Sequence, residues 1–556
     1  MQPALGMRRN TTRLSKKVRQ KKCQHKPKVR RKKCKNHIEV KEVNMILIQV
    51  NSVMFAYDMF HITKAFCPGT EINQSVDESC GNAVEITLDE SILKISNEEL
   101  SEIEDRKLKK RYVNLKVYEW FREVTGKELS WGIMTGVRPT KPMMNLMEEG
   151  FSDEEVIKWM QENYRVTDEK AHLGLQVAKK EKELLEQLDY KDGYSLYVGI
   201  PFCPSICSYC SFSSYPLAQW EKRVDEYLDA VCKELIFIAD KSKEKKLNTI
   251  YIGGGTPTTL NPEQLDRLLT HLETHFSYAD LKEITVEAGR PDSITREKLE
   301  VLKAHNIGRI SINPQTMQQK TLDVIGRKHT VEDIRRVYGI ARELGFDNIN
   351  MDLIAGLPGE TAEDMRDTLM QIKEMAPDSL TVHALAMKRA SKLTQEKKQA
   401  KAMQAKLADS IADEDTVAQS RQADEAAAEQ RREEAQIAET LSEMIELASN
   451  FASQMDLEPN YLYRQKNIAG NFENVGYAKV DKAGIYNILI MEEKQSIVAV
   501  GAGASTKIVV PDDKVIIDEK TGNPKKIVRS ENVKDVEQYI SRIDEMIERK
   551  GELLWH

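Results

Sequence analysis

Between residues 195 and 386, short runs rich in β-branched and aromatic residues alternate with longer stretches whose apolar residues recur at helical spacing. Such runs predict strands, and the segments between them are long enough for crossover helices. Six β/α units in succession predict a parallel sheet with helices outside it, either doubly wound or bent into a partial barrel. The predicted strands are residues 196–200, 249–252, 284–287, 309–312, 348–354 and 380–385.

The region before this alternation is patterned differently. Residues 46–54 form a strand-like run, and mainly helical text follows, with helices expected within 100–123 and 153–188. A strand followed by several helices is typical of a mixed unit. We therefore expect residues 45–190 to form an α+β accessory domain, ahead of a catalytic module at 191–387.

The region after the alternation has two parts. Residues 388–450 are rich in Lys, Gln, Ala and Glu, a composition with high helix propensity, and predict a long exposed helical excursion. Residues 451–556 are expected to cap the catalytic module. Within them we expect strands at 484–491, 496–500 and 515–518 and an amphipathic helix at 533–549.

Residues 1–44 carry 16 Lys and Arg against two acidic residues and contain few apolar residues, so they predict a disordered arm. A solvated tail is the simpler interpretation of these charges, and nucleic-acid binding is not expected. The strand-like run at Met45 could equally mark the native start. The zinc-like residue types in this arm fit no standard ligand spacing; they are Cys23, His25, Cys34 and His37.

The chain of 556 residues is 40% hydrophobic and 31% charged, an ordinary composition for a soluble protein with several domains. No apolar run approaches the roughly 18 residues of a membrane span, so a cytoplasmic location is expected. Eight cysteines are few for this length, and three of them fall within 203–210. This grouping favours a metal site in a reducing compartment over a disulfide framework.

Cys203, Cys207 and Cys210 occupy the loop directly after the first predicted strand, with the spacing C-x3-C-x2-C. Three thiolates on one loop can each bind one iron of a cubane cluster, which leaves the fourth iron open to a further ligand. A zinc site would need a fourth ligand, and this loop has none. The remaining cysteines beyond the basic arm lack such spacing and are interpreted as ordinary; they are Cys67, Cys80 and Cys232.

Polar and glycine residues follow the other predicted strands, at the edge where parallel β/α folds bind ligands. A glycine-rich turn at 253–255, followed by Thr256, would let backbone amides approach a ligand closely. An aspartate within an apolar strand is costly to bury without a partner, which suggests a ligand contact. That aspartate is Asp352; the other candidates are Glu287, which ends the third predicted strand, and Gln315 and Arg327, which follow the fourth.

The cysteines lie in YVGIPFCPSICSYCSF, and further segments follow in order: YIGGGTPTTL, ITVEAGRPDSIT, RISINPQTM, VIGRKHT, NMDLIAGLPGE, YRQKNIAGNFENVGY and VGAGAST. In these motifs the chain resembles the radical S-adenosylmethionine (SAM) superfamily. Within it, the chain is most similar to oxygen-independent coproporphyrinogen III oxidases of the HemZ type, relatives of HemN and HemW. The resemblance implies an α/β fold: a (β/α)6 partial TIM barrel with the accessory domain before it and the cap after it.

The resemblance also implies a [4Fe–4S] cluster on the three cysteines and one or two molecules of SAM. Tyr197 would act with the cysteines at the catalytic centre. The SAM pocket carried over from the family consists of Tyr197, Gly254, Gly255, Thr256, Glu287, Gln315, Arg327, Asp352 and Ala386.

The implied reaction is the oxidative decarboxylation of two propionates of coproporphyrinogen III to vinyl groups, giving protoporphyrinogen IX for haem synthesis. Such an oxidoreductase needs an electron donor, a reductase or a protein of the flavodoxin or ferredoxin type. A tetracarboxylate tetrapyrrole also needs cationic receptors. The candidates are Arg138, Lys141, Arg464 and Lys466.

Two departures keep other functions open. Phe212 stands where the best-known oxidases have a further cysteine, as it does in relatives that bind haem without making it. Where the family has Glu-x-Asp-Pro-Arg, this chain has Glu-Ala-Gly-Arg-Pro at 287–291, which assigns no role to Arg290. The alternatives are a haem chaperone and a radical methyltransferase that opens haem. A chaperone would favour a His-Asn motif in the cap, and residues 465–470 contain no histidine.

Overall fold

The structure is a computed structural model that describes residues 45–385, 395, 399, 416–464, 472–511, 513–518 and 524–555. Val43–His556 form one compact unit by their contacts. The basic arm, most of residues 388–415, Ala386 and Lys466 lie outside the described residues, so the roles expected for them remain predictions.

A central parallel sheet forms from the six predicted strands, and all six are confirmed to within three residues at each end. Neighbouring strands follow one another in chain order from β5 to β12, and every pair among them is parallel. The strands are β5 Gly193–Ile200, β8 Lys246–Gly254, β9 Glu283–Gly289, β10 Arg309–Ile312, β11 Ile349–Ala355 and β12 Ser379–Ala384.

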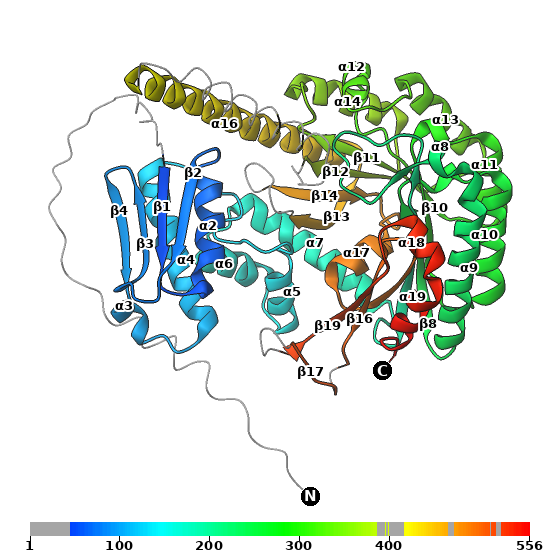
Figure 1. The fold of residues 1–556 in the computed structure, drawn as a ribbon, viewed down its shortest axis with the longest axis horizontal. Coiled ribbons are helices and arrows are strands. Elements are labelled where there is room, and N and C mark those ends of the chain that lie inside the picture. Colours follow the sequence, from blue (N-terminus) through cyan, green and yellow to red (C-terminus); the bar gives the residue numbers. More distant parts are fainter. Residues whose placement is uncertain are drawn as a thin grey trace, which may run out of the picture. The chain divides into compact units, whose positions relative to one another are not determined.

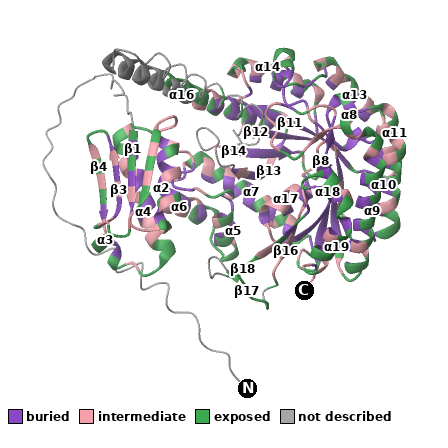
Figure 2. Ribbon diagram, in the orientation of Figure 1, coloured by how far each residue is buried: buried purple, intermediate pink, exposed green. Residues whose placement is uncertain are grey.

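Helices follow these strands and cover the outside of the sheet (Figure 1). Their inward faces are buried and their outward faces exposed, while the strands are buried almost throughout (Figure 2). Such two-sided burial is typical of parallel sheets. The helices are α9 Val224–Lys241, α10 Pro262–His275, α11 Arg296–Ala304, α12 Gln319–Val324, α13 Val331–Glu343 and α14 Ala362–Met375; the short elements β6 Phe202–Cys203, β7 Tyr215–Pro216 and α8 Leu217–Trp220 lie between β5 and α9.

The C-terminal region extends this sheet at both edges. A β-hairpin joins it antiparallel beside β12, and β15 joins it parallel beside β5. The expected strands at 496–500 and 515–518 are confirmed by β15 and β17. The strands of this region are β13 Glu458–Arg464, β14 Glu473–Ala478, β15 Ser496–Val500, β16 Ser505–Val509, β17 Ile516–Ile517, β18 Pro524–Lys525 and β19 Ile527–Glu531.

Two expectations for this region are wrong. Residues 484–491, expected as a strand, form helix α17 Ile485–Glu492, because a short run that is apolar except for Asn487 can be buried in either form. The single terminal helix expected at 533–549 is two helices, α18 Val536–Ser541 and α19 Ile543–Gly551, since the backbone leaves helical geometry at Arg542.

Helix α16 Thr416–Gln454 spans 39 residues and confirms the helical character expected for the second half of 388–450. Its final turns pack onto the barrel through Leu441, Met444 and Ala448, whereas Ile437 remains exposed. Among the residues that the structure describes, no helix is both long and apolar enough to cross a membrane.

The N-terminal region opens with a four-stranded sheet in the order β2-β1-β3-β4. The opening strand is confirmed by β1, but it is shorter than expected because Ser52 caps helix α2. The helices expected within 100–123 and 153–188 are confirmed by α4, α6 and α7, whereas β2 to β4 were not predicted. The elements are β1 Met45–Val50, α2 Val53–Phe66, β2 Glu71–Val76, β3 Asn82–Leu88, β4 Ser91–Ser96, α3 Asn97–Ser101, α4 Arg106–Thr125, α5 Lys141–Glu148, α6 Asp153–Tyr164 and α7 Asp168–Glu186.

Two hydrophobic clusters divide this region. The sheet, α2 and α4 share a core that includes Ile48, Phe66 and Val117. Side chains from α5 to α7, such as Met143 and Leu175, belong instead to the core of the central sheet. Helices α5 to α7 therefore connect the small sheet to the barrel.

A buried ion pair fastens the C-terminal helices to the barrel. The side chains of Lys550 on α19 and Glu234 on α9 are both fully buried, and the ammonium donates to the carboxylate. The Glu234 carboxylate also accepts hydrogen bonds from Tyr539, at 2.6 Å, and Asn532, at 2.9 Å. A buried charge is tolerated when its partners satisfy it as fully as these do.

We expect Lys550→Met to destabilise the protein by about 3–5 kcal/mol, because it leaves the Glu234 carboxylate buried without its counter-charge. Urea unfolding followed by circular dichroism measures the loss. Lys243→Met, which removes an exposed lysine paired with Asp240, is the matched control and is expected to unfold with wild-type behaviour. Equal stability of wild type and Lys550→Met would contradict the assignment.

Candidate functional site

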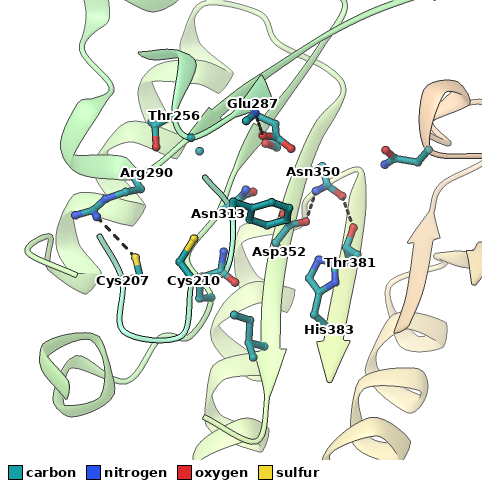
Figure 3. Close-up of a pocket in the computed structure, with 18 of the residues that line it drawn as sticks. Cys207, Cys210, Thr256, Glu287, Arg290, Asn313, Asn350, Asp352, Thr381 and His383 are labelled. Carbon is teal, nitrogen blue, oxygen red and sulfur yellow. Dashed lines mark hydrogen bonds between the residues drawn. The ribbon is translucent and has the colours of Figure 1, made fainter. Parts of the chain in front are cut away.

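A cavity of about 370 Å³ lies inside the parallel barrel, toward the carboxyl ends of its strands (Figure 3). Residues from all six parallel strands or their following loops line it, together with residues of β13 and α17. The structure therefore brings most of the predicted site residues into one space. Those that line it are Cys203, Cys207, Cys210, Gly254, Gly255, Thr256, Glu287, Gln315, Arg327 and Asp352.

The cysteine loop is held by backbone contacts with neighbouring loops. The Tyr215 amide donates to the Pro201 carbonyl at 2.8 Å, and the Ser208 amide donates to the Ile325 carbonyl at 3.0 Å. Cys203 and Cys207 are buried, with 8% and 7% of their surface exposed, and all three thiols of the loop are free. Burial raises the pKa of the Cys203 thiol to about 11, so a metal that binds this sulfur has to displace its proton.

The chemistry of this donor set distinguishes a cluster from a single ion. Among the described residues, no three His, Cys, Asp or Glu side chains are grouped tightly enough to hold one metal ion. A tetrahedral zinc site needs its ligands around one point, whereas the thiolates of a cubane bind different irons and stand farther apart. Three thiolates on one loop match a cubane cluster in their chemistry, with one thiolate for each of three irons.

The glycine turn after β8 packs tightly against the cysteine loop. Gly254 has a φ of 114°, which favours glycine, and a Cβ at Gly255 would lie 2.6 Å from the Phe202 carbonyl oxygen. The expectation that the turn's amides face a ligand is wrong, because they are used within the protein. Gly254 donates to Glu287, Gly255 to Ile200 and Thr256 to Phe202. A ligand at this turn would therefore have to donate hydrogen bonds to the backbone carbonyl oxygens of the turn.

Tyr197 is not among the residues that line the cavity. Its ring lies nearly parallel to the rings of Tyr251 and Tyr486, with centroids 6.2 and 6.3 Å away. Its hydroxyl abuts Gly254, 3.3 Å from where a Cβ would stand. Burial raises the pKa of the hydroxyl, which therefore stays protonated at neutral pH. Tyr197 supports the glycine turn and the wall formed by Tyr251.

Glu287 is the carboxylate at the end of β9. Its carboxylate accepts a short hydrogen bond from the Tyr251 hydroxyl and a longer one, 3.3 Å, from the Gly254 amide. Burial raises its pKa to about 7, against the opposing effect of the tyrosine hydrogen bond. Glu287 therefore changes charge near neutral pH, and its ionised form is a strong acceptor for hydroxyl groups.

Four buried side-chain oxygens along the cavity wall have no hydrogen-bond partner among the residues that the structure describes. They belong to Thr285, Ser311, Asn313 and Gln315. Gln315 also has a φ of 69°, an uncommon value for a residue other than glycine, and two backbone hydrogen bonds to β11 hold it there. Buried polar atoms without partners are costly, so these oxygens indicate a polar ligand that supplies the missing hydrogen bonds.

A hydrogen-bond network continues around the wall from β11. Asn350 donates to Asp352 at 2.7 Å, and Thr381 donates to Asn350 at 3.2 Å and meets the Tyr461 hydroxyl at the same distance. His383 also lines the cavity. Asn350, Asp352, Thr381 and His383 lie close together in Figure 3. These groups fix the orientation of Asp352.

Most residues of this wall were not predicted, although the sequence carries a signal for them. Polar residues occur at every second position of successive strands, and such positions share one face of a strand. That face is the barrel interior. The pairs are Thr285 and Glu287 on β9, Arg309 and Ser311 on β10, Asn350 and Asp352 on β11, and Thr381 and His383 on β12.

The three arginines of the cavity are already engaged. Arg327 donates to the Asn313 carbonyl at 2.5 Å and to the Tyr209 hydroxyl at 3.1 Å. Arg309 is buried at the start of β10 and donates to Asn348 and Ser379. Arg290 is held next to the cysteine loop. Among the described lining residues, these arginines are the cationic groups.

Two predicted substrate receptors have other roles in the structure. Arg464 is 2% exposed, donates to the Met134 carbonyl at 2.6 Å and lies against Trp131. Arg138 donates to the Glu492 carbonyl at 2.7 Å and pairs with Glu493 at 2.8 Å. Arg138 and Arg464 do not line the cavity, and neither does Lys141. The prediction that these three side chains bind substrate inside the cavity is therefore wrong. The side chains of Arg138 and Arg464 instead join the N-terminal region to the barrel.

Comparison with known proteins agrees with this geometry. The family model of the radical SAM superfamily matches residues 197–372. The oxygen-independent coproporphyrinogen-III oxidase-like protein HemZ of Bacillus subtilis is 39% identical over 430 residues, which cover 77% of this chain and 77% of that protein. This chain belongs to the HemZ-like family of radical SAM proteins. The expected fold class, a (β/α)6 partial barrel, is confirmed, and family membership implies a [4Fe–4S] cluster and SAM.

Three further similarities are more limited. The haem chaperone HemW of Bacillus subtilis is 39% identical over 192 residues, which cover 34% of this chain and 50% of HemW. The structure of coproporphyrinogen III oxidase HemN from Escherichia coli matches with 22% identity and a TM-score of 0.45, covering 66% of this chain and 73% of that chain. The oxygen-independent coproporphyrinogen III oxidase of Escherichia coli is 36% identical over 188 residues, which cover 34% of this chain and 41% of that protein. An oxidase and a chaperone are thus similar to the same share of this chain, so these similarities do not decide the substrate.

Helix α17 forms part of the cavity wall and begins beside the start of β9. Its first amides, Ile485 and Tyr486, donate to Glu283 at the start of β9, and Asn487 and Met491 line the cavity. Arg138 binds the carbonyl at its other end, where a cation is favourable. The N-terminal region therefore holds one wall of the cavity in place.

A pair of buried carboxyls lies at the same contact. Glu181 on α7 is fully buried and faces Glu492 on α17. Burial, followed by the charge of Glu492, raises the pKa of Glu181 well above its usual value, and burial also raises the pKa of Glu492. Two carboxylates in one buried contact do not both ionise without cost, so one of them holds a proton.

We expect Glu181→Gln to make stability less dependent on pH. The folded protein holds the Glu181 proton more tightly than the unfolded chain, whose glutamates have a pKa of about 4.3. The stabilisation is therefore complete below that value and is lost as pH rises toward the raised pKa. Thermal unfolding from pH 5 to 9 should show wild type losing stability relative to Glu181→Gln. Glu183→Gln, an exposed change on the same helix, should follow wild type, and parallel profiles for all three proteins would contradict this assignment.

Proposed function

We propose that the protein is an oxygen-independent coproporphyrinogen III oxidase. It would remove two propionate carboxyls as carbon dioxide and leave vinyl groups, giving protoporphyrinogen IX. The observation that carries the proposal is the cavity itself. It combines three cysteines on one loop with a wall of unpartnered oxygens and with Glu287, in a chain related to HemZ along most of its length.

Cys203, Cys207 and Cys210 would hold the [4Fe–4S] cluster. The cluster and SAM together supply a radical that can remove a hydrogen atom from an unactivated carbon. The carbonyl oxygens of Gly254 and Gly255 would accept hydrogen bonds from the SAM amino group, since the turn's amides are already used. Glu287 would accept hydrogen bonds from the ribose hydroxyls.

The other residues would orient the ligands and exclude water. The unpartnered oxygens of Ser311 and Gln315 and the carboxylate of Asp352 line the space beside the glycine turn. Arg327 would balance the carboxylate of SAM from across the cavity. Substrate propionates are expected to meet groups at the mouth of the cavity.

The first experiment is an anaerobic incubation of iron- and sulfide-reconstituted protein with dithionite, SAM and coproporphyrinogen III. We expect the porphyrin to lose two carboxyl groups, with 5′-deoxyadenosine formed in proportion, as mass spectrometry and chromatography measure. Formation of deoxyadenosine with an unchanged porphyrin would reject the substrate and keep the radical chemistry.

Cysteine variants test the cluster independently of substrate. Cys203→Ala is expected to lose the brown chromophore, most bound iron and all deoxyadenosine formation, because a cubane held by two thiolates is not retained. Cys232→Ala, a change at a buried cysteine of α9, is the matched control and should keep all three. Retention of iron and colour by Cys203→Ala would remove the basis for the proposed cluster site.

The raised pKa of Glu287 predicts a pH dependence of SAM binding. The ionised fraction of Glu287 increases as pH rises through about 7, and the ionised carboxylate accepts stronger hydrogen bonds than the neutral acid. Wild type should therefore bind SAM about tenfold more tightly than Glu287→Gln at pH 8. This difference in affinity should become smaller toward pH 6. Because both proteins are measured with the same ligand, titration of SAM itself does not affect the ratio of their affinities. Equilibrium dialysis at both values measures it, and a ratio independent of pH would contradict the role of Glu287.

A haem chaperone is the second candidate, favoured by the likeness to HemW and by His383 in the cavity wall, a residue type that binds haem iron. It predicts tight haem binding, measured by absorbance, that His383→Phe or His383→Ala would weaken. Haem binding without any change of coproporphyrinogen III would favour this candidate over the oxidase.

A further inference from the structure

Arg290 lies at the end of β9 and points its guanidinium at the cysteine loop (Figure 3). Its side chain is 4% exposed. One nitrogen, Nη1, donates to the Ser205 carbonyl at 2.7 Å and to the Ser205 hydroxyl at 2.9 Å. The same nitrogen lies 3.8 Å from the Cys207 sulfur. A buried positive charge therefore stands beside one of the three candidate cluster ligands.

The opposite side of the guanidinium is fixed by Asp292. Nε and Nη2 donate to the two carboxylate oxygens at 2.9 and 2.6 Å, a planar two-point contact. This contact holds Arg290 in one orientation, with Nη1 turned to the loop. Asp292 also balances part of the charge that Arg290 presents to Cys207.

We propose that Arg290 is a positioning residue that donates to the Cys207 thiolate and raises the reduction potential of the cluster. The proposal rests on the cluster site proposed above. Reduction adds one electron to the cluster, and a fixed cation nearby favours the more negative, reduced form. Hydrogen bonds to cluster sulfurs and nearby charge are among the features that set such potentials.

A merely structural role would require only the bond to Ser205. That bond ties the loop to β9 and would be satisfied by a neutral donor. The guanidinium instead brings its charge into a buried place, where burial costs most, and directs it at a sulfur. The sign and the position of the charge together point to the cluster.

The test measures the midpoint potential of the reconstituted cluster by electron paramagnetic resonance in an anaerobic redox series at one pH, with dithionite as reductant. Arg290→Gln is expected to shift the potential to more negative values. Asp292→Asn is expected to shift it to more positive values, because it removes the balancing negative charge. Arg296→Gln, which alters an exposed arginine of α11 paired with Glu343, is the matched control and should show no shift.

Iron content and visible absorption separate the ways in which the test can fail. A wild-type protein that binds no cluster would overturn the proposed function and this inference with it. Full cluster content in Arg290→Gln with an unchanged potential would overturn this inference alone, as would shifts of the same sign in Arg290→Gln and Asp292→Asn. If Arg290→Gln binds too little cluster for a titration, Asp292→Asn decides by itself: a more positive potential supports the proposal, and an unchanged or more negative one overturns it.

Discussion

The site depends on the pairing of β5 with β8, which continues beyond the strands themselves. After Ile200 pairs with Gly254, the amide of Gly255 donates to Ile200 and the amide of Thr256 donates to Phe202. These bonds join the cysteine loop to the glycine turn before either meets a ligand. The close approach requires glycine at 255, where any side chain would strike the Phe202 carbonyl. The three cysteines and the carbonyl groups of the glycine turn are thus held in one frame by backbone geometry.

Much of this frame could be predicted from the sequence. The six parallel strands follow from runs of β-branched residues at regular intervals, and parallel strands place their following loops at one edge. The cysteines were found by their spacing after the first strand, Glu287 because it ends a predicted strand, and Asp352 because it interrupts an apolar strand. In contrast, α17 was expected as a strand, because a short run that is apolar except for Asn487 carries no usable period, and its buried surroundings are set by distant segments.

The cavity wall shows why single residues are harder to predict than elements. Ser311 and Thr381 are ordinary polar residues inside strands. Their role becomes clear only because they lie on the same face of the sheet as polar residues of the neighbouring strands, and that face lines the cavity. Arg464 and Arg138 were expected to bind substrate because cations were needed. Their partners, a carbonyl at 134 and the end of α17, come from regions far away in the chain. Long-range partners of this kind leave no local pattern.

The place of β15 has a consequence for the order in which the protein forms. β5 carries the cysteine loop, and its second neighbour in the sheet is β15, which lies about three hundred residues later in the chain. Until that strand is synthesised, one side of β5 is an open edge that can pair wrongly. Contacts between residues so far apart in the sequence form slowly during folding. The cysteine loop therefore gains the second neighbour of its supporting strand only after residues 496–500 have been synthesised.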